Sequence, residues 1–131
     1  MRIRPVDEVI INERGTITQV TGKGTWKQLN IIYRKAGKLG GGHYHRATTE
    51  LFYVISGKLD VMTTSPASKS TQYFSFAAGG CFEVVPLEQH YMRFNEDTVL
   101  AVIYSKAYDA KAPDTHIYDG LPLLEEVFKP A

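Results

Sequence analysis

Residues 37–57 read Gly37-Lys-Leu-Gly-Gly-Gly-His43-Tyr-His45-Arg-Ala-Thr-Thr-Glu50-Leu-Phe-Tyr-Val-Ile-Ser-Gly57. In a strand, side chains two positions apart point to the same face, so His43 and His45 project together. Residues 46–49 can turn the chain back, and Glu50 then opens a second strand where it can face the same interior. Two imidazoles and one carboxylate that converge from neighbouring strands form half of a transition-metal site. A further ligand has to come from elsewhere, and His90 is the natural candidate.

Short strand-like runs, separated by turn residues, lie on both sides of this segment. The runs are rich in Val, Ile, Tyr and Phe, and Gly, Asn, Asp and Ser stand between them. This pattern is typical of an antiparallel sandwich or barrel, so we expect an all-β fold. The predicted strands cover residues 8–12, 16–21, 29–35, 50–56, 58–64, 72–76, 81–86, 91–94 and 98–104.

One short helix is predicted near the C-terminal end, over residues 123–129. Pro122 can occupy its first turn, and its apolar side chains fall on one side at helical spacing. Residues 65–70 are the best candidate for a mobile hairpin tip, because Ser, Pro, Ala and Lys follow one another there.

Composition excludes several classes of partner. The chain has 131 residues, a net charge of +1 and scattered basic residues, so we expect one domain over residues 1–131 and no nucleic-acid surface. No apolar run is long enough to cross a membrane. Cys81 is the single cysteine and is expected to be a small buried hydrophobe. A chain without internal disulfides suits a reducing compartment, so we expect a cytoplasmic protein.

The spacing of these residues resembles the first motif of the cupin superfamily, in which Gly, His-x-His, Glu and a final Gly stand at fixed intervals. Gly37, His43, His45, Glu50 and Gly57 match it at every position. The second cupin motif is matched only in part. When it is aligned on His90, Gly79 fits, but the Pro, Gly and Asn of the motif fall on other residues, namely Val85, Leu87 and Phe94.

The resemblance implies an RmlC-like jelly roll, also called a double-stranded β-helix, with its barrel core at about residues 29–105 and a short C-terminal helix. In cupins with the complete ligand set, these four side chains bind one divalent transition-metal ion, here Fe, Mn, Ni or Zn. The resemblance therefore assigns metal-ligand roles to His43, His45, Glu50 and His90. It also implies a homodimer that pairs through N-terminal strands.

Three functions are compatible with this fold, because cupins host many activities. The first, which we expect, is a metal-dependent oxygenase or isomerase acting on a small molecule. The second is a metal-free nucleotide-sugar isomerase or epimerase, since the histidine segment followed by Arg46 also resembles these enzymes. There a histidine acts as general base and a tyrosine as acid, and residues 108–116 resemble the ends of some carbohydrate-modifying cupins. The third is a non-catalytic sensor or binding module.

The sequence also predicts where several other side chains near the motifs lie. Tyr44 and Tyr53 are out of phase with the two histidines, so we expect them to pack between sheets or at a dimer contact. Arg46 can meet an anionic substrate or remain in a solvated turn, and His116 is expected at the surface or an interface. An apolar lining of the cavity is expected from Phe52, Val54 and Met92.

Overall fold

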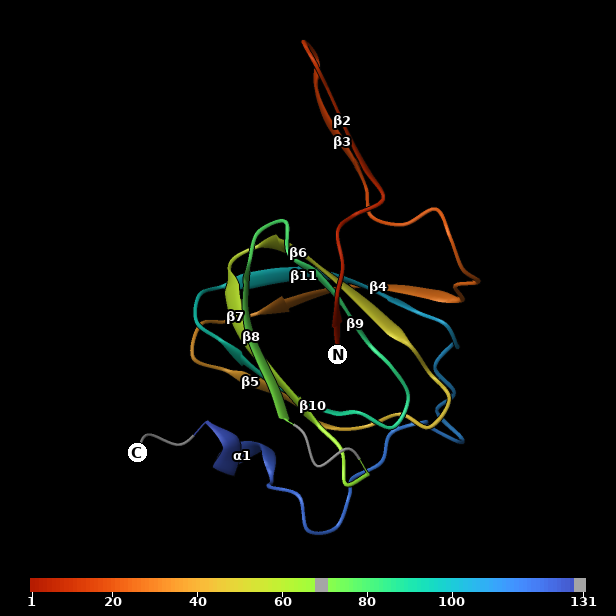
Figure 1. Ribbon diagram of the computed structural model, residues 1–131, viewed down its shortest axis with the longest axis vertical. Helices are drawn as coiled ribbons and strands as arrows, with labels where there is room; N and C mark the ends of the chain where they lie inside the picture. The colour runs from red at the N-terminus through yellow and green to blue at the C-terminus, as the bar shows by residue number, and fades with distance from the viewer. Residues whose placement is uncertain (68–70, 129–131) are drawn as a thin grey trace.

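Two antiparallel sheets form the body of the protein (Figure 1). The structure is a computed structural model and describes residues 1–67 and 71–128. One sheet has five strands, in the order β1 (Arg2–Ile3), β9 (Cys81–Val84), β6 (Glu50–Ser56), β11 (Thr98–Tyr104) and β4 (Gln28–Arg34). The other has four, in the order β5 (Leu39–His43), β10 (Gln89–Phe94), β7 (Lys58–Thr64) and β8 (Thr71–Ala77).

This architecture confirms the predicted all-β jelly roll. The one helix among the described residues, α1 (Leu124–Val127), is shorter than the segment predicted at 123–129, of which residue 129 lies outside the described chain. Of the predicted hairpin tip at 65–70, residues 68–70 also lie outside the described chain.

Strand β5 is the element that the propensity of the sequence does not reveal. Its centre is Gly40, Gly41 and Gly42, and glycine is a poor strand former. Pairing with β10 overrides this preference, because His43 lies opposite His90 and Gly41 opposite Tyr91 in the ladder. A Cβ atom at Gly41 would lie 2.5 Å from the backbone carbonyl oxygen of His90, so only glycine allows this close approach.

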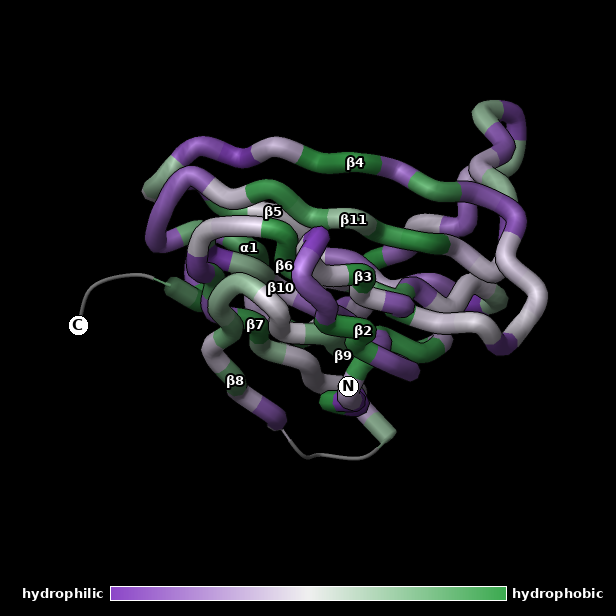
Figure 2. The backbone as a smooth tube through the Cα atoms, turned by 90° about the horizontal axis from the view of Figure 1, so that it is seen from above, coloured by the Kyte–Doolittle hydropathy of each residue, from purple (hydrophilic) through white to green (hydrophobic). Residues whose placement is uncertain are grey.

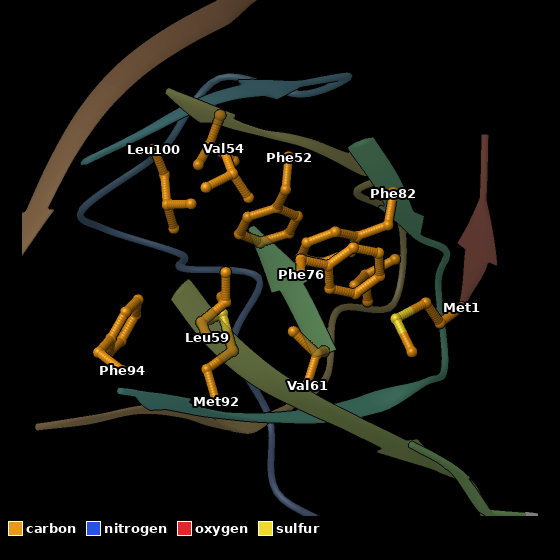
Figure 3. Close-up of a cluster of buried hydrophobic side chains, with 12 residues drawn as sticks. Met1, Phe52, Val54, Leu59, Val61, Phe76, Phe82, Met92, Phe94 and Leu100 are labelled. Atoms are coloured by element: carbon orange, nitrogen blue, oxygen red, sulfur yellow. The ribbon is translucent and has the colours of Figure 1, made fainter. Parts of the chain in front are cut away.

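The core lies between the inner faces of the two sheets (Figure 3). Phe82 on β9 stacks on Phe52 of β6 and Phe76 of β8, with ring centroids 4.8 and 4.4 Å apart. Because side chains alternate along each strand, these rings point inward. Buried aromatic rings of this kind contribute strongly to the stability of the core. The same core includes Met92, Phe94 and Leu100, which also form the apolar wall of the cavity described below.

A two-stranded hairpin, β2 (Glu8–Asn12) and β3 (Gly15–Gln19), projects away from the barrel (Figure 1). Strand β4 forms an outer edge of the five-stranded sheet, and Figure 2 shows apolar residues in its middle. On β4 the side chains of Leu29, Ile31 and Tyr33 are 61%, 62% and 53% exposed. The structure therefore leaves apolar groups uncovered on this side of the molecule.

Cys81 is buried, as expected of a small apolar side chain, and burial raises the pKa of its thiol to about 11. The thiol is therefore protonated at neutral pH and a poor nucleophile. Among residues 1–67 and 71–128, there is no helix of the length and apolarity that a membrane crossing requires.

Backbone geometry explains why the last position of the first motif, residue 57, is a glycine. It joins β6 to β7 with φ of 96°, and a Cβ atom there would lie 2.4 Å from Oγ1 of Thr98 and 2.5 Å from the carbonyl oxygen of Asp97. Gly79 has a similar φ of 90°, but a Cβ atom at this position would have no heavy atom within 4 Å. The two sites therefore separate backbone strain from steric overlap.

We predict that Gly57→Ala lowers the free energy of unfolding by roughly 2–5 kcal/mol, because strain and overlap add. The matched control Gly79→Ala carries strain alone and should cost roughly 1–2 kcal/mol. Urea unfolding followed by circular dichroism measures both. Equal losses of unfolding free energy in the two variants would show that residues 97 and 98 move aside for the new methyl group without destabilising the fold.

Candidate active site

The four side chains singled out by the motifs come together where β5, β6 and β10 lie closest. His43 ends β5 and pairs with His90 of β10, whereas Glu50 is the first residue of β6. His45 lies just beyond β5, where the chain turns toward β6. Glu50 and His90 are buried at 4% and 1% exposure, and His43 and His45 are partly buried.

The polar atoms of this cluster are close enough to interact directly, since one such atom from each side chain lies within 4.8 Å of the others. Nε2 of His45 is 2.7 Å from Oε1 of Glu50, and Nε2 of His90 is 3.7 Å from the same oxygen. Neither Nε2 of His45 nor Oε1 of Glu50 has a hydrogen-bond partner elsewhere in the described chain. The short approach between them is therefore the central interaction of the site.

Electrostatics raises the pKa of one histidine and lowers the pKa of the other two. Burial opposes charge on His45, but Glu50 outweighs it and raises the pKa of His45 above its ordinary value. Burial likewise opposes ionisation of Glu50, but His45 and the other imidazoles outweigh it and lower the pKa of Glu50. Burial lowers the pKa of His43, with a contribution from His45, and lowers that of His90 to about 4. At neutral pH His43 and His90 are therefore neutral, whereas Glu50 favours a proton on His45.

A cavity of about 370 Å³ opens beside the cluster, within the size range of small-molecule sites. His43, His45, Glu50 and His90 all line it. Its other wall is apolar and includes Phe52 and Met92, as predicted, whereas Val54 belongs to the core and does not line it. Two cationic side chains line the cavity as well, Arg34 from β4 and Lys106 from the segment after β11.

Tyr104 is a cavity residue that the motif comparison missed. It ends β11 opposite Glu50 in the ladder, and burial raises the pKa of its hydroxyl. The hydroxyl is therefore protonated at neutral pH and able to donate a hydrogen bond. Strand alternation could have predicted that Tyr104 faces inward, because it is in phase with the inward-facing Leu100 and Val102.

The remaining side chains considered from sequence lie away from the cavity. Tyr44 is buried and stacks on Tyr118 with ring centroids 3.8 Å apart. Arg46 is exposed in the turn after His45 and does not line the cavity. His116 pairs with Tyr44 through backbone hydrogen bonds of 2.8 and 2.9 Å, so it forms a contact within the chain.

The chain has an RmlC-like jelly-roll fold, which is the fold of cupins. The chain belongs to the polysaccharide biosynthesis C-terminal domain family, which matches residues 10–116. No curated protein matches the chain.

Solved structures with this fold include sugar ketoisomerases. QdtA, a sugar 3,4-ketoisomerase from Thermoanaerobacterium thermosaccharolyticum in complex with TDP, is 21% identical with a TM-score of 0.72, over 86% of this chain and 84% of that chain. WlaRA, a TDP-fucose-3,4-ketoisomerase from Campylobacter jejuni, is 17% identical with a TM-score of 0.71, over 91% and 90%. At these identities the likeness establishes the fold alone.

A third similar structure is the capsular polysaccharide assembling protein CapF from Staphylococcus aureus, which is 20% identical with a TM-score of 0.64. The match covers 84% of this chain but 32% of CapF. The chain therefore spans about a third of the length of CapF.

The expected cofactor, a divalent Fe, Mn, Ni or Zn ion, is wrong. QdtA and WlaRA, which share the fold, are described as sugar 3,4-ketoisomerases, and the stated ligands of QdtA are TDP and TDP-4-keto-6-deoxyglucose rather than a metal ion. The physical reason for the error is that motif spacing brings the same groups together for either purpose. A buried carboxylate needs a compensating charge, and the imidazole of His45, 2.7 Å from Glu50, supplies it when protonated.

We predict that Glu50→Gln lowers the pKa of His45, because the neutral amide no longer offsets burial of the imidazolium. The pair contributes most to stability between the ordinary pKa values of 4.5 for Glu50 and 6.5 for His45. The contribution of His45 is lost as pH rises through its raised pKa, and that of Glu50 as pH falls through its lowered pKa.

Titration of the imidazole resonances by NMR measures the shift in the Glu50→Gln variant. Glu83→Gln is the matched control, because Glu83 is also buried but pairs with Arg4 at 2.7 Å on another part of the fold. An unchanged pKa of His45 in Glu50→Gln would contradict the ion pair.

Proposed function

We propose that the chain is a nucleotide-sugar 3,4-ketoisomerase that uses histidine side chains and no metal ion. The observation that carries the proposal is that His43, with a lowered pKa, and His45, whose Nε2 lies 2.7 Å from Oε1 of Glu50, line one cavity of small-molecule size. The shared fold of QdtA and WlaRA agrees with this reading. So does the description of a QdtA variant with one histidine replaced by asparagine, in complex with TDP-4-keto-6-deoxyglucose.

The chemistry of a 3,4-ketoisomerase requires a proton acceptor and a proton donor at adjacent carbons. We assign the acceptor to neutral His43, which removes the proton from C3 of a 4-keto sugar as the C4 oxygen gains negative charge. We assign stabilisation of that oxygen to protonated His45 and to the hydroxyl of Tyr104. O4 then takes up a proton, which gives an enediol. Loss of the proton from O3 and addition of a proton to C4 give the 3-keto sugar, with all atoms conserved.

His43 fits the role of base better than His45 for a geometric reason. Nδ1 of His45 bonds to the backbone carbonyl of Asp114 and its Nε2 faces Glu50, so both ring nitrogens already have partners. An imidazolium in this position supplies positive charge and a proton, whereas His43 has a lowered pKa and is ready to accept one.

The cavity also supports a negatively charged substrate. Arg34 and Lys106 line it together with the acidic Asp109 and Asp114, and we assign binding of a diphosphate group to the two cationic side chains. The apolar wall formed by Phe52, Met92 and Leu100 suits a deoxygenated face of the sugar. We infer that the sugar lies in the cavity, near the histidines, and that the nucleotide extends outward. The single cysteine and a small charged substrate favour a cytoplasmic location.

We predict that the purified protein converts TDP-4-keto-6-deoxyglucose to its 3-keto isomer, and that chelation with EDTA leaves the rate unchanged. NMR in D₂O follows both the product and deuterium incorporation at the exchanging carbon. His43→Asn should lower kcat by about 100-fold or more, because general-base catalysis contributes that much. Binding of the substrate without conversion would contradict the proposal and identify a binding protein instead, and loss of activity on chelation would contradict its metal independence.

We further propose that two copies form a homodimer through the apolar side of the five-stranded sheet. Leu29, Ile31 and Tyr33 on the edge strand β4 are more than half exposed, and so are Ile11 and Ile17 on the projecting β2–β3 hairpin. The three side chains on β4 share one face of the strand, and exposed apolar groups gathered in this way mark protein interfaces. An isolated hairpin is also only marginally stable, which favours its packing against a second copy.

We predict that Ile31→Asp converts a dimer to a monomer, because the new charge would be buried at the interface. Sedimentation velocity of the two proteins measures the change. Ile117→Asp is the matched control, since Ile117 is equally exposed at 63% but lies in the segment after β11. A monomeric wild-type protein would refute the dimer.

A further inference from the structure

The turn that carries His45 is held by a residue far along the chain, Asp114. One carboxylate oxygen, Oδ1, accepts hydrogen bonds from the backbone N–H of Arg46 and from Nε2 of His116, at 2.9 and 3.0 Å. The other, Oδ2, accepts from the backbone N–H of Ala47 at 2.9 Å and from Oγ1 of Thr48 at 2.8 Å. One carboxylate thus satisfies donors from three successive residues of the turn.

The backbone of Asp114 contacts the histidine itself. Its carbonyl oxygen accepts a hydrogen bond from Nδ1 of His45, while Nε2 of the same ring faces Glu50. A proton fixed on Nδ1 determines which nitrogen of the ring is directed at the acid, a relation that also orients histidines in other sites.

We propose that Asp114 is a positioning residue, which clamps residues 114–116 onto the turn at 46–48 and thereby fixes the imidazole of His45 against Glu50 in the cavity. The inference rests on the proposed function for its consequence in catalysis, but its structural part can be tested without turnover. Asp114 acts through His45 and is not assigned contact with the reacting carbons.

The sheet alone does not fix this ring. His45 lies beyond the end of β5, and the backbone hydrogen bond that it receives is from Leu87, at 2.7 Å, through its carbonyl oxygen. That bond anchors the main chain but leaves the side chain free to rotate. The carbonyl of Asp114 supplies the missing constraint, and the carboxylate keeps that carbonyl in place because four hydrogen bonds end on it.

A second anchor allows the segment to stay folded when the carboxylate is changed. The backbones of Tyr44 and His116 exchange two hydrogen bonds, and Tyr118 stacks on Tyr44. Tyr118 also donates its hydroxyl proton to the carbonyl oxygen of Leu87 at 2.9 Å. Residues 116–118 are therefore held independently of Asp114, so a variant at 114 should loosen the clamp without unfolding the segment.

The decisive variant is Asp114→Asn, which keeps shape but places an amide N–H₂ against donors of the turn. We expect kcat on the keto sugar to fall by about 10- to 100-fold with KM changed by no more than about twofold, as for a displaced catalytic group. We also expect the Nδ1 proton of His45 to exchange faster with solvent in ¹H–¹⁵N NMR. Asp114→Ala should show both effects more strongly.

Asp97→Asn is the matched control, because its carboxylate also accepts a backbone N–H, that of Ala36 at 2.9 Å, but away from the cavity. It should retain wild-type kcat and proton exchange. Wild-type exchange of the His45 Nδ1 proton in Asp114→Asn would overturn the positioning role, whatever the activity. If the wild-type protein converts no keto sugar, the proposed function fails, while the exchange measurement still decides the role of Asp114.

Discussion

A buried carboxylate is the constraint on which the rest of the site depends. Glu50 opens a central strand and is almost completely excluded from solvent, where an unpaired charge would cost several kcal/mol or shift its protonation. His45 answers that requirement, because its Nε2 lies 2.7 Å from the carboxylate and the carboxylate favours a proton on the ring. Burial of His43, with a smaller contribution from His45, lowers the pKa of His43 and keeps it neutral. The buried carboxylate thus separates the pKa values of two adjacent histidines.

The barrel and the histidine cluster could be predicted from the sequence because both are encoded locally. Alternation of apolar residues identifies most strands, and a strict spacing from Gly37 to Gly57 brings three polar groups to one place. The chemistry of the cluster could not be predicted in the same way. A set of imidazoles and a carboxylate serves a metal ion or an internal ion pair equally well, and the choice depends on distances and burial that a linear motif does not contain.

Other features escaped prediction for different physical reasons. Strand β5 is rich in glycine, which has a low propensity for strands, and it forms because it pairs with β10. Its own sequence therefore did not predict a strand. Tyr104 could have been found, since it is in phase with inward-facing residues of β11. Asp114 could not, because its partners at residues 45–48 are 66 to 69 positions away in the chain and no spacing rule connects them. Long-range contacts of this kind are specified by the folded shape.

The glycine at position 41 has a wider consequence for how such a barrel can change. Because its missing side chain sets how near two backbones come, the separation of His43 and His90 is a property of the main chain. Cavity-lining residues on β4 or after β11 can therefore be exchanged without disturbing the spacing of these two rings. An engineer who diversifies the cavity would leave the glycine untouched and vary the opposite wall.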